Sequence, residues 1–518
     1  MPPSTPSAVP ALNPCQPAAR PWVLGATVLG SSMVFIDGTV VNVALPALQR
    51  QFQAGAGALQ WVVEAYALLL AALLLVGGSA GDHFGRRRVF LLGVVLFAAA
   101  SAWCGLASDM QQLILARALQ GIGGALLVPG SLALISASFP EQLRGRAIGT
   151  WSGYTAITAA VGPLVGGYLI DHVSWRLAFL INLPLALVVV GLTLRYVPES
   201  RDRAAAPGLD WGGALLASAG LGCVVYGLIA SPASGWLAAP VLGTLAAAVL
   251  LLAAFIVVEQ RHPAPMLPLH LFRSRDFSGA NLLTLLLYAA LGGGLYFFPL
   301  NLIQVQGYSA VEAGAALLPF VLLMFALSRW SGGLVDRYGA RRPLVIGPLI
   351  AGLGFAGLAL PGIGGSYWAT YFPAVLVLGL GMAVTVAPLT TTVMNALDSE
   401  LAGAASGVNN AVSRVAALLA IAVFGIVMQS GFDTRLGPEL VARGVPAAQA
   451  APLLAQHGKL AATVVPAGAP PARQAQLRDA IGAAYVAGFR RVMWLSALLA
   501  LGSAACAWVW IAPRRLPV

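Results

Sequence analysis

The stretch GSAGDHFGRRR at residues 78–88 returns as GGLVDRYGARR at residues 332–342. The Asp, the Gly that follows the aromatic residue and the Arg pair stand at the same spacing in both copies. Each copy ends one long apolar segment and begins the next. A polar hinge repeated about half a chain apart indicates two similar membrane-embedded halves, an organisation typical of alternating-access transporters.

Composition supports a membrane protein. Of the 518 residues, 59% are hydrophobic and 9% are charged, whereas a soluble domain carries about 25% charged residues. The net charge of +11 does not indicate nucleic-acid binding, because the basic residues form short clusters between apolar segments and not one soluble face.

Apolar stretches of about 20 residues, each long enough to span a bilayer, recur fourteen times. We expect them near 22–46, 58–80, 88–107, 111–138, 147–170, 175–195, 210–230, 236–258, 277–300, 310–334, 343–361, 368–392, 403–429 and 489–512. The prediction is an all-α integral membrane protein with 14 transmembrane helices. Its parts are a tail at 1–21, a six-helix bundle at 22–200, an inserted helix pair at 201–276, a second six-helix bundle at 277–512 and a tail at 513–518.

Arginine residues set the predicted orientation, since they gather in alternate short loops and in the C-terminal tail. By the positive-inside rule both termini are cytoplasmic, and the chain lies in the cell (inner) membrane. A loop at 430–488 would then lie outside the cell. The arginines concerned are Arg86–Arg88, Arg144, Arg146, Arg195, Arg201, Arg203, Arg261, Arg273, Arg275, Arg337, Arg341, Arg342, Arg514 and Arg515.

Asp37 stands inside the first apolar segment, where a carboxylate costs about 2.5–3.5 kcal/mol to insert. A residue that costly usually lines a cavity, pairs with a partner or relays protons. The alternative is a structural polar contact to Asn42 or Thr39.

Two more charged residues stand in apolar segments. Glu64 lies in the second segment with Trp61 and Leu68 on its face, and is either a proton site or a solvated residue of an outer vestibule. Arg117 in the fourth segment either promotes deprotonation of a nearby carboxylate or holds backbone carbonyls. These three residues are the predicted proton-coupling group.

Two glycine-containing motifs have a structural and a functional interpretation. The fifth segment carries Gly162, Pro163, Gly166 and Gly167, which suit either a sliding interface or ordinary close packing. In the repeated hinge, topology alone explains the arginines, whereas the Asp and Gly residues indicate a gate. The predicted gating residues are Gly78, Asp82, Gly85, Arg87, Asp336, Gly339 and Arg341.

No enzyme site is predicted. The five histidines and the four cysteines show no ligand or disulfide spacing, and no Walker A, GxSxG or dinucleotide pattern occurs. We therefore expect no metal and no cofactor. Any uphill transport would draw on an ion gradient or on the membrane potential.

Five motifs together resemble the major facilitator superfamily, and within it the fourteen-helix drug:proton antiporters of the EmrB/QacA type. They are the hinge at 78–88, DGTVVNVALP at 37–46, LILARALQGIGG at 113–124, GPLVGG at 162–167 and WRLAFLINLP at 175–184. The resemblance implies the major facilitator fold and an exporter of amphipathic, often cationic compounds in exchange for protons. It also implies Asp37 and Glu64 as proton or cation sites.

Two other functions stay open: a dedicated exporter of an endogenous metabolite or siderophore, and a receptor or structural protein without transport. The retention of Asp37, Arg117 and Gly162-Pro163 argues against the second. Expected partners are a lipophilic or cationic small molecule, protons and lipid; in a cell with two membranes, a periplasmic adaptor and an outer-membrane channel are further candidates. Polar and aromatic residues that could line a substrate cavity are Phe35, Tyr66, Tyr154, Tyr288 and Asn301.

Overall fold

The computed structural model describes residues 16–201, 210–263, 265–397, 402–466 and 468–513. Every regular element in these ranges is helical. Thirteen of the described helical stretches are long and apolar enough to cross a membrane. The predicted all-α membrane architecture is therefore confirmed. Most of the two predicted tails lies outside the described ranges, and the end of the first tail is already helical at Arg20.

The N-terminal bundle is built from the first seven α-helices. They are α1 (Arg20–Phe52), α2 (Ala56–Phe84), α3 (Arg86–Leu106), α4 (Met110–Ser138), α5 (Glu141–His172), α6 (Leu177–Leu180) and α7 (Asn182–Tyr196). The last two together make one span. The inserted pair follows as α8 (Trp211–Ser234) and α9 (Ala239–Arg261).

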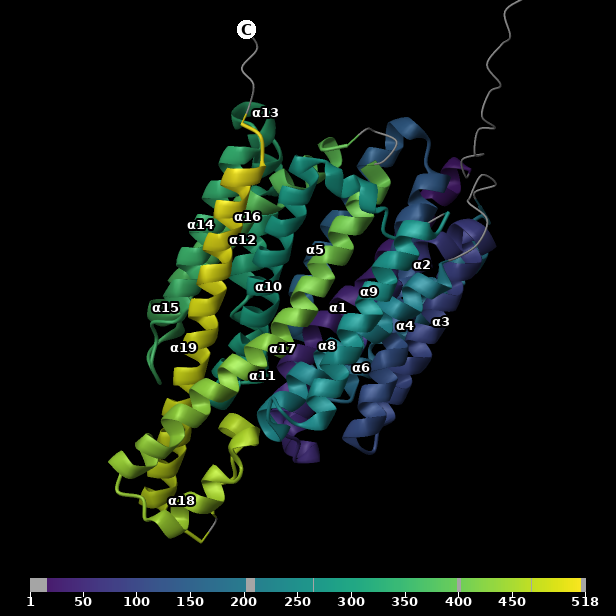
Figure 1. The fold of residues 1–518 in the computed structure, drawn as a ribbon. Helices are drawn as coiled ribbons and strands as arrows, with labels where there is room; N and C mark the ends of the chain where they lie inside the picture. Colours follow the sequence, from purple (N-terminus) through teal and green to yellow (C-terminus); the bar gives the residue numbers. More distant parts are fainter. Residues whose placement is uncertain (1–15, 202–209, 264, 398–401, 467, 514–518) are drawn as a thin grey trace, which may run out of the picture.

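The C-terminal bundle contains the remaining α-helices. They are α10 (Arg275–Gln304), α11 (Ala310–Ala315), α12 (Leu318–Gly332), α13 (Leu334–Tyr338), α14 (Arg341–Leu358), α15 (Tyr367–Thr370), α16 (Phe372–Asn395), α17 (Ala402–Ala442), α18 (Ala447–Leu454) and α19 (Pro471–Trp510). Figure 1 shows α10, α12, α14, α16, α17 and α19 running side by side. The described ranges also contain 3₁₀ turns at Pro17–Ala19, Leu269–Arg273 and His457–Ala462.

The segment predicted near 343–361 is the one that falls short of a membrane span. It forms α14, which has 18 residues and begins with two arginines, so its average hydropathy is lower than that of its neighbours. It nevertheless packs between α16 and α19 as a member of the bundle. The difference between thirteen spans and fourteen thus reflects composition and not a missing helix.

The region predicted as a loop at 430–488 is largely helical. Helix α17 has 41 residues and continues to Ala442, and α19 has 40 residues and begins at Pro471. Between them lie α18 and the turn His457–Ala462. Figure 1 shows this hairpin projecting from one end of the molecule, opposite α13 and the C-terminal end of α19. We call these the loop end and the hinge end.

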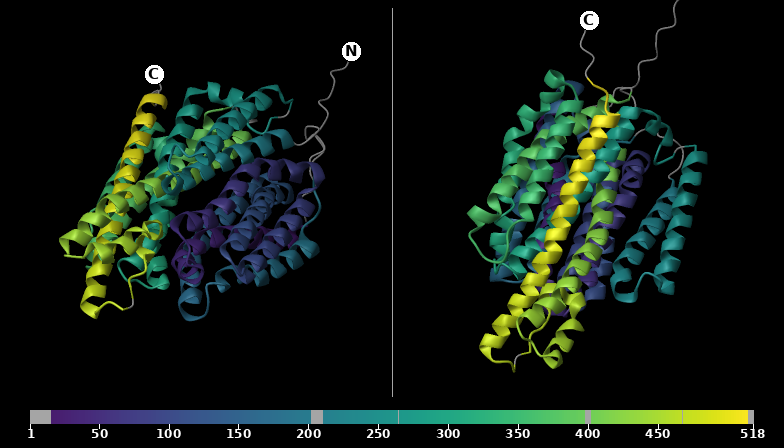
Figure 2. Two further views of the ribbon diagram at one scale, coloured as in Figure 1. Left: turned by 60° about the horizontal axis from the view of Figure 1, so that its bottom comes forward. Right: turned by 60° about the vertical axis from the view of Figure 1, so that its left-hand side comes forward.

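Helix α8 of the inserted pair contacts both bundles, and α9 packs on α8. Figure 2 shows α8 and α9 along one side of the molecule. Buried Val225 of α8 forms a small apolar cluster with Leu68 of α2 and Leu418 of α17. Helix α8 therefore closes the seam where the two bundles meet, and is not a detached linker.

Polar contacts between the bundles gather at the loop end. The amide of Gln304 donates a hydrogen bond to Gln49 Oε1 at 2.7 Å, and the amide of Gln60 donates to the carbonyl of Ile421 at 3.2 Å. In each pair one residue belongs to the N-terminal bundle and the other to the C-terminal bundle. The loop end is consequently closed by direct contacts between the halves.

A second closure at the loop end joins α5 to α11. The carboxylate of Asp171 accepts the backbone N–H groups of Ala310 and Val311 at 3.1 and 2.9 Å. A Cβ placed on Gly314 would lie 2.4 Å from the carbonyl oxygen of Pro163. Only glycine permits this approach, so the GPLVGG segment packs on both its own bundle and the opposite one.

Candidate functional site

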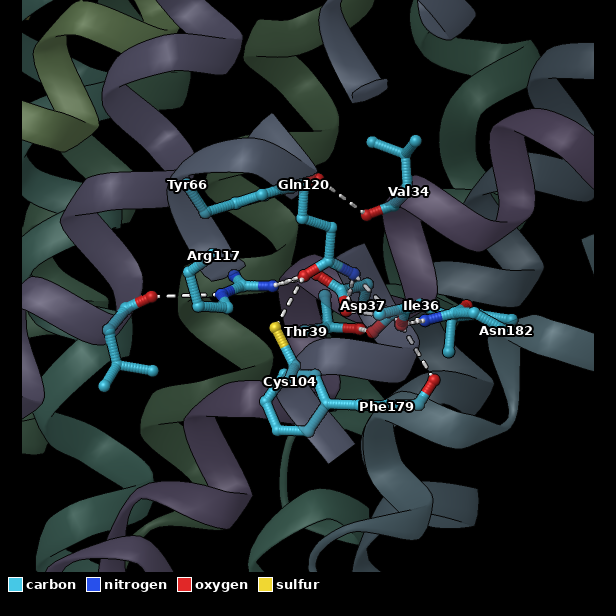
Figure 3. A network of polar contacts seen from close by, with 12 residues as sticks. Val34, Ile36, Asp37, Thr39, Tyr66, Cys104, Arg117, Gln120, Phe179 and Asn182 are labelled. Atoms are coloured by element: carbon cyan, nitrogen blue, oxygen red, sulfur yellow. Dashed lines mark hydrogen bonds and ion pairs between the residues drawn. The ribbon is translucent and has the colours of Figure 1, made fainter. Parts of the chain in front are cut away.

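A buried ion pair lies inside the N-terminal bundle. Asp37 of α1 and Arg117 of α4 are each 1% exposed, and the guanidinium of Arg117 donates to Asp37 Oδ2. The second carboxylate oxygen, Oδ1, accepts from the amide of Gln120 at 2.7 Å and from that of Asn182 at 3.5 Å. Figure 3 shows Asp37, Arg117 and Gln120 converging. The charge of Asp37 is therefore fully compensated in this arrangement.

Further hydrogen bonds hold the partners of Asp37 in place. Ser101 of α3 accepts from the amide of Asn182 at 2.9 Å and from that of Gln120 at 3.2 Å. Its hydroxyl donates to the carbonyl of Phe179 at 2.8 Å. The network thus connects α1, α3, α4, α6 and α7. A substitution at Asp37 would therefore alter hydrogen bonds on most helices of the bundle.

Arg117 is also tied to α2. Its Nε donates to the carbonyl of Val62 at 3.0 Å, and its guanidinium lies 4.1 Å from the ring centre of Tyr66. The Tyr66 hydroxyl donates in turn to the carbonyl of Val34 at 3.3 Å. The sequence left two kinds of partner open for Arg117, a carboxylate and a backbone carbonyl. Arg117 contacts one of each.

Glu64 lies on the other side of α2. Val62 and Tyr66 are two residues before and after it, and both face Arg117, so helical geometry turns Glu64 away from the ion pair. Glu64 is 0% exposed, and neither carboxylate oxygen has a hydrogen-bond partner in the described chain. It lies on the side of α2 that carries Trp61 and Leu68 toward α8 and α17. The residue is buried, and is not part of a solvated vestibule.

The two carboxylates therefore differ in kind. Asp37 is the paired carboxylate, enclosed within one bundle. Glu64 is the unpaired carboxylate, at the seam between α2 and the opposite bundle. Thr39, proposed from the sequence as an alternative partner of Asp37, donates its hydroxyl to the carbonyls of Phe35 and Ile36 instead.

The first hinge copy forms a local set of charged contacts. Asp82 Oδ1 lies 2.6 Å from Arg86 Nη2, so its partner is Arg86 and not Arg87. The backbone N–H of Arg87 donates to Glu199 Oε1 at 3.1 Å, while its side chain donates to the carbonyl of Leu194 at 3.0 Å. The hinge thereby joins the end of α2 to the segment after α7.

Gly85 is required by this geometry. Its φ of 109° is open to glycine alone, and a Cβ there would lie 2.8 Å from Glu199 Oε1. Gly78 lies about two turns earlier, where a Cβ would meet Pro129 at 3.6 Å, an ordinary contact. The gating role predicted for Gly78 thus has no particular steric support, in contrast to Gly85.

The second hinge copy is built differently. Helix α12 ends at Gly332, short α13 follows, and Gly339 turns the chain with φ of 75°. The guanidinium of Arg341 lies 3.9 Å from the ring centre of Trp508 on α19. The predicted gating residue Asp336 belongs to α13, but its side chain lies outside the described part of the chain.

The glycines of α5 allow the close approach to α1. A Cβ on Gly162 would lie 2.6 Å from Thr39 Oγ1, and one on Gly166 would lie 2.4 Å from Val40 Cγ1. A Cβ on Gly167 would instead lie 2.6 Å from the carbonyl oxygen of Ala310 in the opposite bundle. The segment combines the two interpretations, since it packs tightly and also forms part of the contact between halves.

The five residues proposed for a substrate cavity are not gathered at one place. Tyr66 stacks on Arg117, and Asn301 donates to the Tyr371 hydroxyl at 3.0 Å inside the C-terminal bundle. Tyr154 is 56% exposed, while Phe35 and Tyr288 are half-buried. Residue type alone gave no indication of which side of each helix they occupy.

A family model of the Major Facilitator Superfamily matches residues 27–421. The chain belongs to the major facilitator superfamily. Within this family assignment, the chain has many candidate membrane spans. It also has a repeated hinge, two bundles and the buried Asp37–Arg117 pair.

Curated relatives in this superfamily are named for resistance and export. The tetracenomycin C resistance and export protein of Streptomyces glaucescens is 35% identical over 94% of this chain and 91% of that protein. The multidrug resistance protein Stp of Mycobacterium tuberculosis is 36% identical over 81% of this chain and 78% of that protein. The family and these relatives are transporters, which agrees with the prediction that the chain is not an enzyme.

A solved structure shares the fold. A bacterial homolog of the human lysosomal transporter Spinster, in an inward-facing and unoccupied conformation, matches with a TM-score of 0.68. The match covers 95% of this chain and 97% of the solved chain at 19% identity. At that identity the likeness concerns the fold alone.

Proposed function

We propose that this protein exports drugs and other amphipathic toxic compounds in exchange for protons, by alternating access of its two bundles. The observation that carries the proposal is Glu64, a fully buried carboxyl group at the seam between the halves, with no hydrogen-bond partner among the described residues. The names of the relatives, which refer to antibiotic resistance and export, support the substrate class.

Whether the loop end is open or closed determines whether Glu64 can exchange its proton. A carboxylate buried with neither cation nor hydrogen bond is unstable, so closure of the loop end favours the protonated acid. Opening of the loop end would bring water to Glu64 and allow it to exchange its proton. Closure therefore occurs with the proton bound, and the proton is carried toward the other side.

The proposed orientation makes this exchange useful for export. The arginine clusters support an orientation with the hinge end in the cytoplasm and the loop end outside, in the cell membrane. The closed loop end then faces the outside, so the cavity between the halves is shut on the outer side. A proton taken up from outside is then released inward when substrate binds from the cytoplasm, and Asp37 with Arg117 is the second group whose pairing can change.

The test uses purified protein in liposomes that contain a pH-sensitive dye. Addition of ethidium should release protons from the wild type, and an imposed pH gradient should drive ethidium transport until an uncoupler is added. Glu64→Gln keeps the shape of the side chain but cannot exchange a proton, so transport should lose its response to the gradient.

Asp109→Asn is the matched control, because Asp109 is an exposed helix cap at the loop end and asparagine caps equally well. This control should behave like the wild type. Gradient-driven transport by Glu64→Gln at the wild-type rate would refute the role of Glu64. Asp37→Asn should also abolish proton-driven transport, and full activity of that variant would remove Asp37 from the coupling group.

A further inference from the structure

A cavity of about 420 Å³ lies at the loop end, where α2, α8, α10, α17 and α19 meet. Its volume lies within the range of about 300–1,000 Å³ that is usual for ligand pockets. The turn His457–Ala462 covers it, because the amide of Gln49 donates to the carbonyl of Lys459 at 3.2 Å. The cavity is separate from the Asp37–Arg117 pair, neither member of which lines it.

The inserted helix α8 supplies one wall. Leu228 and Ile229 of α8 line the cavity, and Ile229 lies against the start of α2, where a Cβ on Gly57 would be 3.2 Å from its Cγ2. One turn earlier on α8, Val225 is fixed in the seam between the bundles. The wall is therefore held in position by both halves, and a change in their relative position would change the cavity.

The polar groups of the cavity are almost all neutral. Amides line it from several elements, among them Gln60, Gln304 and Gln429, and no carboxylate of the described chain does so. The Tyr485 hydroxyl, on a side chain that is 1% exposed, has no hydrogen-bond partner in the described residues. A buried unpaired hydroxyl in a cavity wall is a donor available to a ligand.

Aromatic rings complete the lining. Tyr296 and Phe297 of α10 are 3% and 2% exposed, with ring centres 4.8 Å apart, and both line the cavity beside Tyr485. The two groups that can carry a positive charge, His457 and Lys459, belong to the covering turn. Such a lining disfavours a cationic ligand, because its own groups that can be charged are both positive. The carboxylate of Asp433, behind the lining, already contacts His457 at 3.0 Å and Gln429 at 2.8 Å.

We propose that this cavity is a binding site for an uncharged aromatic amphipath with hydroxyl or carbonyl groups. The rings of Tyr296 and Phe297 would contact its apolar face, and the amides and the Tyr485 hydroxyl would bind its polar edge. As a site for exported cargo it rests on the proposed export function. As a binding site it does not depend on proton coupling.

The test measures binding of 1,8-dihydroxyanthraquinone to the purified full-length protein in lipid nanodiscs, without a proton gradient. Ile229→Trp fills the cavity from the α8 wall and should weaken binding by at least about tenfold. Leu215→Trp is the matched control on the same helix, since Leu215 is 69% exposed and does not line the cavity. It should bind like the wild type.

A second variant separates binding from folding. Tyr485→Phe removes only the unpaired hydroxyl, so the protein should be as stable as the wild type or more stable, while binding weakens about fivefold to tenfold. Wild-type affinity in both Ile229→Trp and Tyr485→Phe would overturn the proposal, as would competitive displacement of the anthraquinone by ethidium. If the anthraquinone binds as expected and the liposomes release no protons, the site stands and the coupling proposal fails.

Discussion

The two bundles share a repeated hinge but differ in what they bury. The N-terminal bundle encloses the Asp37–Arg117 ion pair. In the C-terminal bundle, the amide of Asn409 donates to Asn281 Oδ1 at 3.1 Å and to the Thr284 hydroxyl at 2.7 Å. One half thus contains a charge whose pairing can change with protonation, and the other contains a neutral network that cannot respond in that way. We therefore propose that the coupling chemistry belongs to the N-terminal half.

The two hinge copies also differ in the kind of contact that they make. The first copy joins Asp82 to Arg86 and holds the backbone of Arg87 against Glu199. The second copy sets Arg341 over the ring of Trp508. An ion pair opens when water or a competing charge enters, whereas a cation over an indole is a packing contact as much as an electrostatic one. The described contacts of the first hinge are therefore mainly electrostatic, whereas the described contact of the second also involves packing.

The largest expected effect comes from removing the buried cation. Arg117→Met leaves Asp37 without its counter-ion and should lower the free energy of unfolding by about 3–5 kcal/mol. Denaturant titration in detergent measures this change. Arg478→Met is the control in the other half, since Arg478 is exposed and its hydrogen bond is to Gln474 of its own helix, and it should cost about 1 kcal/mol or less. Equal losses in the two variants would contradict the contrast between the bundles.

Substitution of the hinge glycines should cause the second-largest loss of stability. Both Gly85 and Gly339 have positive φ, and alanine at either should cost about 1–3 kcal/mol in backbone strain. Gly85→Ala should lose further stability, because its new methyl group also displaces the Glu199 carboxylate. Unfolding titrations of the two variants make the comparison. A larger loss at Gly339 would show that the second hinge is the more constrained.

The neutral network should have a smaller effect. Asn409→Ala removes two uncharged hydrogen bonds and should cost about 1–2 kcal/mol, with the rate of efflux kept within about threefold. Asn410→Ala is its neighbour control, since Asn410 is exposed and bonds only within its own helix turn. Loss of gradient-driven transport in Asn409→Ala would move part of the coupling into the C-terminal half.

The smallest effect on stability should be that of the hinge ion pair. Asp82 is 38% exposed, so solvent screens its pairing with Arg86, and Asp82→Asn should cost about 0.5 kcal/mol. Its effect should instead fall on the maximal transport rate, with little change in the half-saturating substrate concentration. A change confined to the half-saturating concentration would argue against a gate.

Hydropathy predicted where the chain spans the membrane, but it did not predict where the helices end. The extensions of α17 and α19 beyond the apolar stretch carry Asp433, Arg435, Arg473 and Arg478, so their average hydropathy resembles that of a loop although they are helical. Helical periodicity continues past the membrane, but a search for apolar runs does not detect it.

Only the charged residues of the site could be predicted from the sequence. Asp37 and Arg117 are costly in apolar segments, and Gln120 follows Arg117 by one helical turn. Ser101 and Asn182, which hold the same network together, gave no comparable signal because neutral polar residues are common in membrane helices. Glu199 was equally hidden, since an acidic residue after the last helix of a bundle has no distinguishing neighbour.

The length of α17 and α19 has a practical consequence for imaging. At 1.5 Å per residue, the 41 and 40 residues of these helices each extend about 60 Å, twice the roughly 30 Å of a hydrocarbon core. Their paired ends with α18 form a rigid projection continuous with the bundle (Figure 1). An antibody fragment raised against that projection would report the orientation of single particles, and its tilt between images would measure how far the C-terminal bundle rocks.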